Sequence, residues 1–163
     1  MNDLIFLRKL KRKRIIELVE SSEEMKSSYL TKAENCLKSA KILSQNQLYE
    51  NSISESYFCM YNSLLSLFFK IGIKSENHSA SISLFDKLFG KKDLVKIISW
   101  AKSERIDKQY YIETQQIIKV NRVSCDEMIL KAEDFLIKMK LLLNEMSNED
   151  VSTARISFVK MLG

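Results

Sequence analysis

One stretch of this chain, residues 51–71, repeats its apolar side chains at intervals of three and four residues. Such spacing places these side chains on one face of an α-helix. The face consists of Ile53, Tyr57, Tyr61, Leu64, Leu65, Phe68 and Ile71. Because this is the most apolar segment of the chain, we expect the helix to form the centre of the hydrophobic core.

Residues that interrupt helices are scarce along the whole chain. The 163 residues include no proline and only 3 glycines, and these two residue types are the strongest breakers of regular structure. A hydrophobic content of 45% with 29% charged residues is ordinary for a single globular domain. We therefore predict an all-α fold, an up-and-down antiparallel bundle of four to five main helices with shorter helices added.

Polar and glycine signals predict where individual helices begin and end. Ser21–Glu24 has the pattern of a capping box, so we expect a helix to start there with Ser21 as its N-cap. Gly90 is suited to end a helix. Residues 107–116 are less regular and are expected to link the shorter helices to the last long one. Ser124–Glu127 is a second capping-box pattern, although apolar residues just before it leave an earlier helix start open.

These signals divide the chain into three parts. Residues 1–20 are expected to form a basic N-terminal arm or helix, residues 21–146 the helical bundle, and residues 147–163 a C-terminal tail. The tail contains apolar residues that fit either a short helix or docking on a partner.

Six basic residues lie between positions 8 and 14. One interpretation is a site for RNA or another polyanion, since cations that neutralise phosphates release counterions. The residues considered for this role are Lys11, Arg12, Lys13 and Arg14. The other interpretation is a helix that packs its leucines on the bundle and turns its cations to water. The net charge of +5 is compatible with both.

Several functional classes find no support in the sequence. The three cysteines lie far apart, and a single histidine cannot build a multi-histidine metal site within one chain. Phosphate-loop, dinucleotide-binding and nucleophile-elbow motifs are absent. No apolar run reaches the ~18 residues needed to cross a bilayer. We therefore expect a cytoplasmic protein with reduced thiols and without a cofactor, a metal or a membrane partner.

The only histidine, His78, follows a polar connection and precedes a new stretch with helical spacing. It is therefore expected at the first turn of a helix, where free N–H groups attract phosphate. The neighbouring Asn77 and Ser79 are expected first as capping residues, with phosphate contact as the alternative.

Two segments resemble a known family. Ser56-Tyr57-Phe58-Cys59-Met60-Tyr61-Asn62 resembles the small-Tyr-aromatic-small-Met-aromatic-polar run in the central helix of the HEPN family. Residues 72–79 are similar to that family's Gly-x-x-x-Lys-Ser-His-Ser connection, and the resemblance covers residues 5–145 approximately. HEPN proteins are small helical proteins of archaea and bacteria associated with nucleotide and RNA biochemistry. The resemblance implies a homodimer in a toxin–antitoxin or related defence system, working beside a separate nucleotidyltransferase-type partner.

The resemblance also implies a candidate catalytic site. HEPN ribonucleases have an arginine, four to six intervening residues and then a histidine, near a dimer axis. This chain has no arginine there, and the nearest cations are Lys70 and Lys74. His78 could transfer protons in metal-independent RNA cleavage while a lysine stabilises charge, although lysine lacks the planar fork of arginine. The alternative is a non-catalytic helical module that binds protein or nucleic acid.

Three polar residues of the central helix complete the candidate site. Tyr57 and Tyr61 share the apolar face, which favours core positions over a platform for stacking bases. Asn62 stands where the HEPN family often has histidine, so an acid–base role is lost, but its amide remains able to contact a nucleotide.

Overall fold

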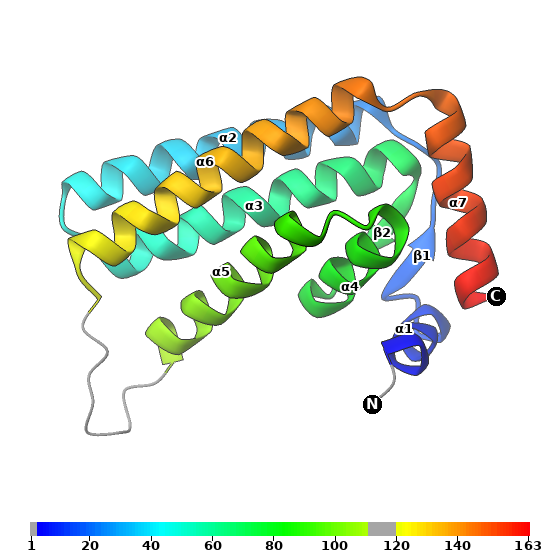
Figure 1. The fold of residues 1–163 in the computed structure, drawn as a ribbon, viewed down its shortest axis with the longest axis horizontal. Helices are drawn as coiled ribbons and strands as arrows, with labels where there is room; N and C mark the ends of the chain where they lie inside the picture. Colours follow the sequence, from blue (N-terminus) through cyan, green and yellow to red (C-terminus); the bar gives the residue numbers. More distant parts are fainter. Residues whose placement is uncertain (1–2, 111–119) are drawn as a thin grey trace.

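The structure is a computed structural model that describes residues 3–110 and 120–163 (Figure 1). Its elements are α1 (Asp3–Arg12), β1 (Ile16–Leu18), α2 (Glu23–Gln45), α3 (Tyr49–Ile71), β2 (Ile73–Ser75), α4 (His78–Phe89), α5 (Lys92–Tyr110), α6 (Arg122–Glu145) and α7 (Asn148–Leu162). The prediction of an all-α fold is confirmed, with two short strands added. The link expected over residues 107–116 lies partly outside the described residues, because α5 continues to Tyr110.

Helix α3 is the centre of the bundle. It packs against α2, α5 and α6, and most of its side chains are buried. Figure 1 shows α2 and α5 running opposite to α3, while α6 runs opposite to α2. This arrangement is the expected up-and-down bundle, and its most enclosed helix is the one with the strongest apolar repeat.

Small side chains bring α2 close to α3. Ala33 and Ala40 on α2 are fully buried. Ser52 on α3 donates a hydrogen bond to the Ala40 carbonyl at 2.7 Å, and Ser66 donates to the Lys26 carbonyl at 2.8 Å. The two buried hydroxyls are therefore satisfied by the backbone of the neighbouring helix, and these bonds fix how α2 sits along α3.

Two predicted helix starts differ from the structure. Ser22, not Ser21, is the N-cap of α2, because its extended backbone brings its hydroxyl to the Met25 N–H. Helix α6 begins after its N-cap Asn121, and Ser124 is the third residue of the helix, where its side chain completes the capping box. The expected helix end at Gly90 is confirmed, since this residue adopts the left-handed conformation with φ of 60°.

Strands β1 and β2 form an antiparallel pair that the sequence did not predict. Ile16 lies opposite Ser75, and Leu18 lies opposite Ile73. Three-residue strands are too short to show an alternating pattern. The pair buries Ile16 and Ile73 and holds the connection between α3 and α4, so it fixes where His78 begins its helix.

The N-terminal and C-terminal helices complete the core. Helices α1 and α7 contact each other, and their buried residues Leu7, Leu10, Ala154, Phe158 and Leu162 belong to the same hydrophobic cluster as α3. The residues of the expected tail thus form a helix on the protein's own bundle. Arg155 of α7 donates to the carbonyls of Val19, Ile71 and Gly72 at 2.9, 2.8 and 3.2 Å, which satisfies the C-terminal end of α3.

We expect Gly72→Ala to destabilise the protein more than Gly90→Ala. Both glycines have positive φ, and an alanine in this conformation is strained by about 1 kcal/mol. At Gly72 an added Cβ would also collide with Arg155 Nη1 and lie 2.5 Å from the Val19 carbonyl oxygen, whereas at Gly90 it would meet no atom within 4 Å. In urea unfolding, Gly72→Ala should lower the free energy of unfolding by about 2–4 kcal/mol, and Gly90→Ala should lower it by about 1 kcal/mol. Equal losses would contradict the packing of α7 against this turn.

Candidate functional site

His78 is held against the middle of α3 by its position at the first turn of α4. The expected N-cap Asn77 accepts a hydrogen bond from the Ala80 N–H at 2.9 Å, which fixes the start of the helix. The imidazole Nδ1 lies 2.5 Å from the Tyr57 hydroxyl. The Tyr61 ring stacks on the imidazole, with centroids 3.8 Å apart and planes at 10°.

A group of buried hydrogen bonds fixes the turn next to His78. Ser81 donates to Ser75 at 2.8 Å or to the Asn77 carbonyl at 3.0 Å, and its hydroxyl lies 3.3 Å from that of Tyr61. These contacts join β2, α4 and α3. They hold Tyr61 and the first turn of α4 together, and so hold the stacked His78 ring in place.

The environment of His78 favours a neutral ring. Burial lowers its pKa below the ordinary value, and the charges of Arg105 and Lys102 lower it further. Burial also raises the pKa of Tyr57, so its hydroxyl stays protonated. The tautomer in which Nδ1–H donates to Tyr57 leaves Nε2 free to accept a proton. A neutral imidazole of this kind is suited to act as a general base.

The cation beside the histidine comes from α5. The Arg105 guanidinium carbon lies 4.8 Å from the ring centroid of Phe58 and 5.5 Å from that of Tyr57. Its Nε is buried without a hydrogen-bond partner among the described residues. Lys102, one turn earlier on α5, donates to the Ser79 hydroxyl. Two cations therefore stand at the start of α4, where an anion is favoured.

Sequence reasoning missed Arg105 and Lys102 because they lie on a different helix from His78. A signal was nevertheless present. Ile98 and Ala101 are buried, and Arg105 follows them at seven and four residues, so it continues the inward face of α5. A cation in line with a buried stripe indicates a charge that must meet a partner or a ligand.

Lys70 and Lys74 are engaged elsewhere. Lys70 Nζ donates to the Leu143 carbonyl near the end of α6 at 2.6 Å, a favourable place for a cation. Lys74 pairs with Glu76 at 2.8 Å and with Glu17 at 3.6 Å across the strand pair, which raises the pKa of Lys74. The structure thus gives both lysines carboxylate or carbonyl partners away from the aromatic group around His78.

Asn62 also faces away from this group. Its amide donates to Cys36 Sγ on α2 at 3.6 Å. Burial, together with Glu55, raises the pKa of the Cys36 thiol to about 11, so the thiol is protonated. Asn62 therefore contributes to the contact between α2 and α3, whereas Tyr57 and Tyr61 face His78.

The basic arm is partly used within the fold. Arg8 donates to the Met161 carbonyl at 3.2 Å and Lys11 to the Leu162 carbonyl at 3.1 Å, so both satisfy the C-terminal end of α7. Arg12, Lys13 and Arg14 are exposed. Helix α1 thus packs on the bundle while exposed cations, Lys9 among them, face water, and a polyanion site on this arm stays a prediction.

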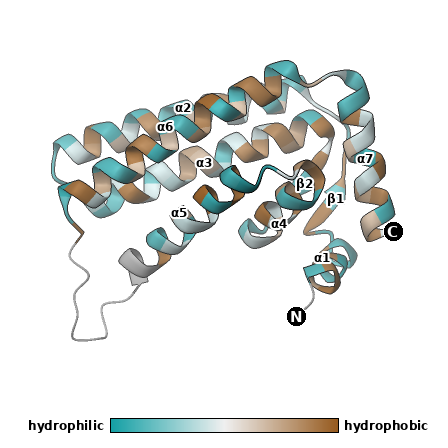
Figure 2. Cartoon of the chain, in the orientation of Figure 1, coloured by the Kyte–Doolittle hydropathy of each residue, from teal (hydrophilic) through white to brown (hydrophobic). Residues whose placement is uncertain are grey.

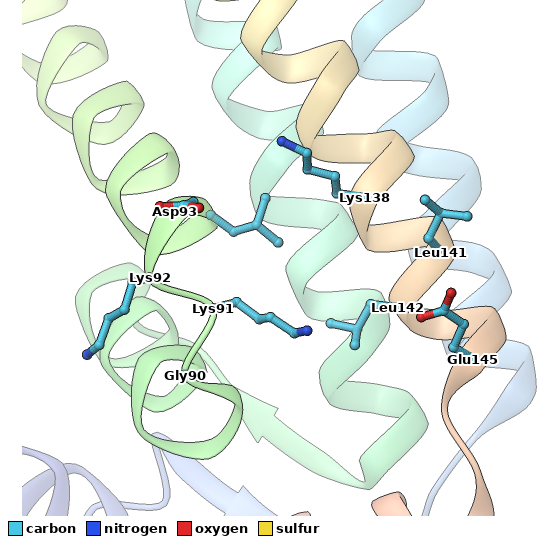
Figure 3. A pocket seen from close by; sticks show the side chains of 9 residues that line it. Gly90, Lys91, Lys92, Asp93, Lys138, Leu141, Leu142 and Glu145 are labelled. Atoms are coloured by element: carbon cyan, nitrogen blue, oxygen red, sulfur yellow. The ribbon is translucent and has the colours of Figure 1, made fainter.

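Two hollows lie along α5. One of 410 Å³ separates α4 from α5 and includes Ser79 and Lys102, so it starts beside His78. A larger hollow of 500 Å³ lies between the α4–α5 turn and α6 (Figure 3). It is lined by Gly90, Lys91, Lys92, Asp93, Leu94, Lys138, Leu141, Leu142 and Glu145 and includes none of the residues around His78. The smaller hollow therefore reaches Ser79 and Lys102, although His78 and Arg105 are not among the residues that line it.

Two further features concern only the described residues. Their histidine, cysteine and carboxylate side chains form no cluster of three or more that could hold a metal ion. None of their helices combines the length and the apolar character that crossing a bilayer requires.

Comparison with known proteins supports the resemblance noted above. A model of the HEPN domain matches residues 27–142, more than half of the chain. The chain belongs to the HEPN domain family. The matched HEPN region runs from α2 to α6 and contains both His78 and Arg105. UPF0332 protein glr0978 of Gloeobacter violaceus is 34% identical over 56 residues, which cover 34% of this chain and 44% of that protein.

We expect the stability of this HEPN protein to fall when the pH is lowered from neutral through 6.5, the ordinary imidazole pKa. Because the folded-state pKa of His78 is lower than the unfolded-state value, the unfolded chain binds more protons in this range. His78→Asn keeps a polar side chain but cannot titrate. Urea unfolding between pH 7.5 and pH 5.5 should therefore show a weaker pH dependence for His78→Asn than for the wild type. The same dependence in both proteins would contradict the burial of a neutral ring.

Proposed function

We propose that this HEPN protein associates with RNA and cleaves it without a metal ion at the site formed by His78, Arg105 and Lys102. The observation that supports this proposal is the pair of cations that α5 brings to His78. A base for the 2′-hydroxyl and a cation for the phosphate are the groups that metal-independent cleavage needs. The sequence near His78 offered no arginine, and the fold supplies one from a different helix.

The reaction follows from this arrangement. Neutral His78 accepts the proton of a ribose 2′-hydroxyl, and the 2′-oxygen attacks the adjacent phosphorus. The bond from phosphorus to the 5′-oxygen breaks, and the protonated imidazole returns its proton to that oxygen. The products are a 2′,3′-cyclic phosphate and a 5′-hydroxyl. Arg105 and Lys102 stabilise the negative charge of the pentavalent phosphorane.

A second candidate function is a non-catalytic binding module. The close stacking of His78 on Tyr61 and its bond to Tyr57 favour a structural role, in which the ring joins α4 to α3. In this alternative, the cations bind phosphate or an acidic partner without chemistry.

The wider biological setting is part of the same proposal. HEPN family membership supports a homodimer in a toxin–antitoxin or defence system, with a separate nucleotidyltransferase-type partner and a cytoplasmic location. The chemistry at His78 is the part of this proposal that the purified protein can test directly.

Cleavage of a labelled structured RNA in chelator tests the ribonuclease. We expect His78→Ala to lower the rate by about 10²-fold or more, since proton transfer is lost. Arg105→Gln should lower it by about 10²-fold, and Arg105→Lys should lower it less because the charge remains. The Lys70→Ala, Lys74→Ala double variant is the control and should keep most activity.

Circular dichroism should establish that each variant is folded. If the wild type cleaves no faster than folded His78→Ala, the ribonuclease proposal is wrong and the binding module replaces it. If the double lysine variant loses activity while Arg105→Gln keeps it, Arg105 is not the cation.

The basic arm allows a separate measurement. Replacing exposed Arg12 and Lys13 by alanine should lower the slope of log affinity for RNA against log salt by about 1.4 to 1.8, if each cation neutralises one phosphate. Replacing two other exposed lysines, Lys91 just before α5 and Lys96 on it, is the matched control and should leave the slope unchanged. An unaltered slope in the arm variant would exclude the arm from RNA binding.

A further inference from the structure

The hollow of 410 Å³ between α4 and α5 differs in charge along its length. Lys102 and Ser79 line it next to His78, and Lys102 donates a hydrogen bond to the Ser79 hydroxyl. Asp86 also lines it, seven residues after Ser79 on α4, which corresponds to about 10 Å along the helix axis. The hollow therefore has a cation at one end and a carboxylate at the other.

The walls between these ends combine apolar and hydroxyl side chains. Hydrophobic and hydrophilic residues are mixed along both α4 and α5 (Figure 2), and the hollow receives both kinds. Ile82 and Val95 supply apolar surface, while Ser83 and Ser99 supply hydroxyls. Apolar walls with a few polar groups that fix orientation are typical of a site for a small organic group.

Two polar atoms of this region have no hydrogen-bond partner among the described residues. Ser83 Oγ in the hollow and Arg105 Nε in the candidate site are both buried in this condition. A buried polar atom without a partner costs free energy, which is recovered when a ligand supplies one. One such atom in each place favours a ligand that occupies both the site and the hollow.

The carboxylates of the hollow are balanced by lysines, which limits the repulsion of an anionic ligand. Lys92 Nζ donates to both oxygens of Asp86 at 2.6 and 2.8 Å, and Lys87 Nζ lies 3.8 Å from the Asp3 carboxylate. Each oxygen of Asp86 keeps a second lone pair after these bonds. Asp86 can therefore still accept hydrogen bonds from a ligand.

A guanine nucleotide matches this distribution of groups. Its phosphate fits beside Lys102 at the first turn of α4, and its base then extends toward Asp86. The separation along α4 is close to the length of a nucleotide from its phosphate to the far edge of its base. Guanine presents two adjacent N–H donors, N1–H and the 2-amino group, to the two oxygens of a carboxylate. Adenine, cytosine and uracil present no such pair.

The lining residues also indicate which nucleotide of an RNA enters the hollow. Lys102, which stabilises the phosphate in the proposed reaction, lines the hollow, whereas His78, which accepts the 2′-proton, does not. The 2′-hydroxyl belongs to the nucleotide on the 5′ side of the cleaved bond, and the leaving 5′-oxygen belongs to the nucleotide on the 3′ side. The base that extends from the phosphate into the hollow is therefore that of the 3′ nucleotide.

We infer that the hollow between α4 and α5 selects guanine in the nucleotide directly 3′ of the cleaved bond, with Asp86 as the residue that contacts the base. The position in the RNA rests on the proposed ribonuclease. The preference for guanine rests on the hollow alone, so the two can be tested separately.

Cleavage of a random-sequence RNA in chelator, followed by sequencing of the fragments with a 5′-hydroxyl, measures the preference. We expect guanine as the first base of these fragments about tenfold more often than any other base. Asp86→Asn should remove most of this enrichment, because the amide replaces one of the two acceptors by a donor. Asp93→Asn is the matched control, since Asp93 is an exposed carboxylate that lines the other hollow, and it should keep the enrichment.

A second control separates base contact from the ion pair. Lys92→Gln removes the partner of Asp86 but keeps the carboxylate, so guanine should stay enriched. Loss of the enrichment in Lys92→Gln would overturn the role of Asp86 as the contact to the base. Equal frequencies of the four bases in the wild type, or the same enrichment in Asp86→Asn, would overturn the inference.

Mononucleotides test the hollow without cleavage, because they contain no bond for the site to break. In NMR titrations of the wild type, guanosine 5′-phosphate should bind about tenfold more tightly than adenosine 5′-phosphate. Inosine 5′-phosphate lacks the 2-amino group and should bind with an intermediate affinity. Asp86→Asn should remove most of the difference between guanosine and adenosine 5′-phosphates. Equal affinities of the wild type for these two nucleotides would overturn the preference for guanine.

The two measurements separate the failure of this inference from the failure of the ribonuclease proposal. If the wild type cleaves no RNA but prefers guanosine 5′-phosphate through Asp86, the ribonuclease proposal is wrong and the selectivity of the hollow stands. If the wild type cleaves RNA through His78 without a base preference, the ribonuclease stands and this inference is wrong.

Discussion

The burial of α3 is the constraint on which the rest of the structure depends. This helix is enclosed by α2, α5 and α6. Its serines donate hydrogen bonds to backbone carbonyls of α2, which fix the rotation of α3 about its own axis and its position along α2. Its C-terminal carbonyls are satisfied by Arg155 of α7, and the left-handed Gly72 turns the chain into the strand pair. The strand pair then starts α4 at His78. The position of the histidine against Tyr57 and Tyr61 is therefore a consequence of how α3 is held.

The chemistry of the site follows from the same enclosure. Aromatic rings remove water from one side of His78, and two cations of α5 oppose a positive charge on the imidazole, so both effects lower its pKa. A neutral base beside a partly buried guanidinium is favourable for a phosphodiester, whose negative charge compensates the cations. Helix α5 thus supplies the two cations that make the contact between α3 and α4 a candidate site.

The sequence predicted those features that local patterns determine. The apolar repeat identified α3, and the change of pattern at His78 and Gly90 placed the ends of α4. The N-caps of α2 and α6 differ from the predicted ones because each helix start offers two residues able to cap it, Ser21 and Ser22 or Asn121 and Ser124. Only the backbone geometry decides between them. The inward position of Arg105 can be inferred from the spacing along α5, but its contact with Tyr57 and Phe58 cannot, since it depends on how α5 packs. Lys70 was a candidate because it is near His78 in sequence, but the turn of the helix directs it to α6.

The central claim is that burial, with the nearby charges of Arg105 and Lys102 added to it, keeps His78 neutral, and it can be tested by NMR. His78 is the only histidine, so its imidazole signals need no assignment. A pH titration should give a pKa below 6.5 for the wild type and a higher pKa for Arg105→Gln, because one of the opposing charges is removed. A wild-type pKa at or above 6.5, or the same pKa in both proteins, would contradict the account.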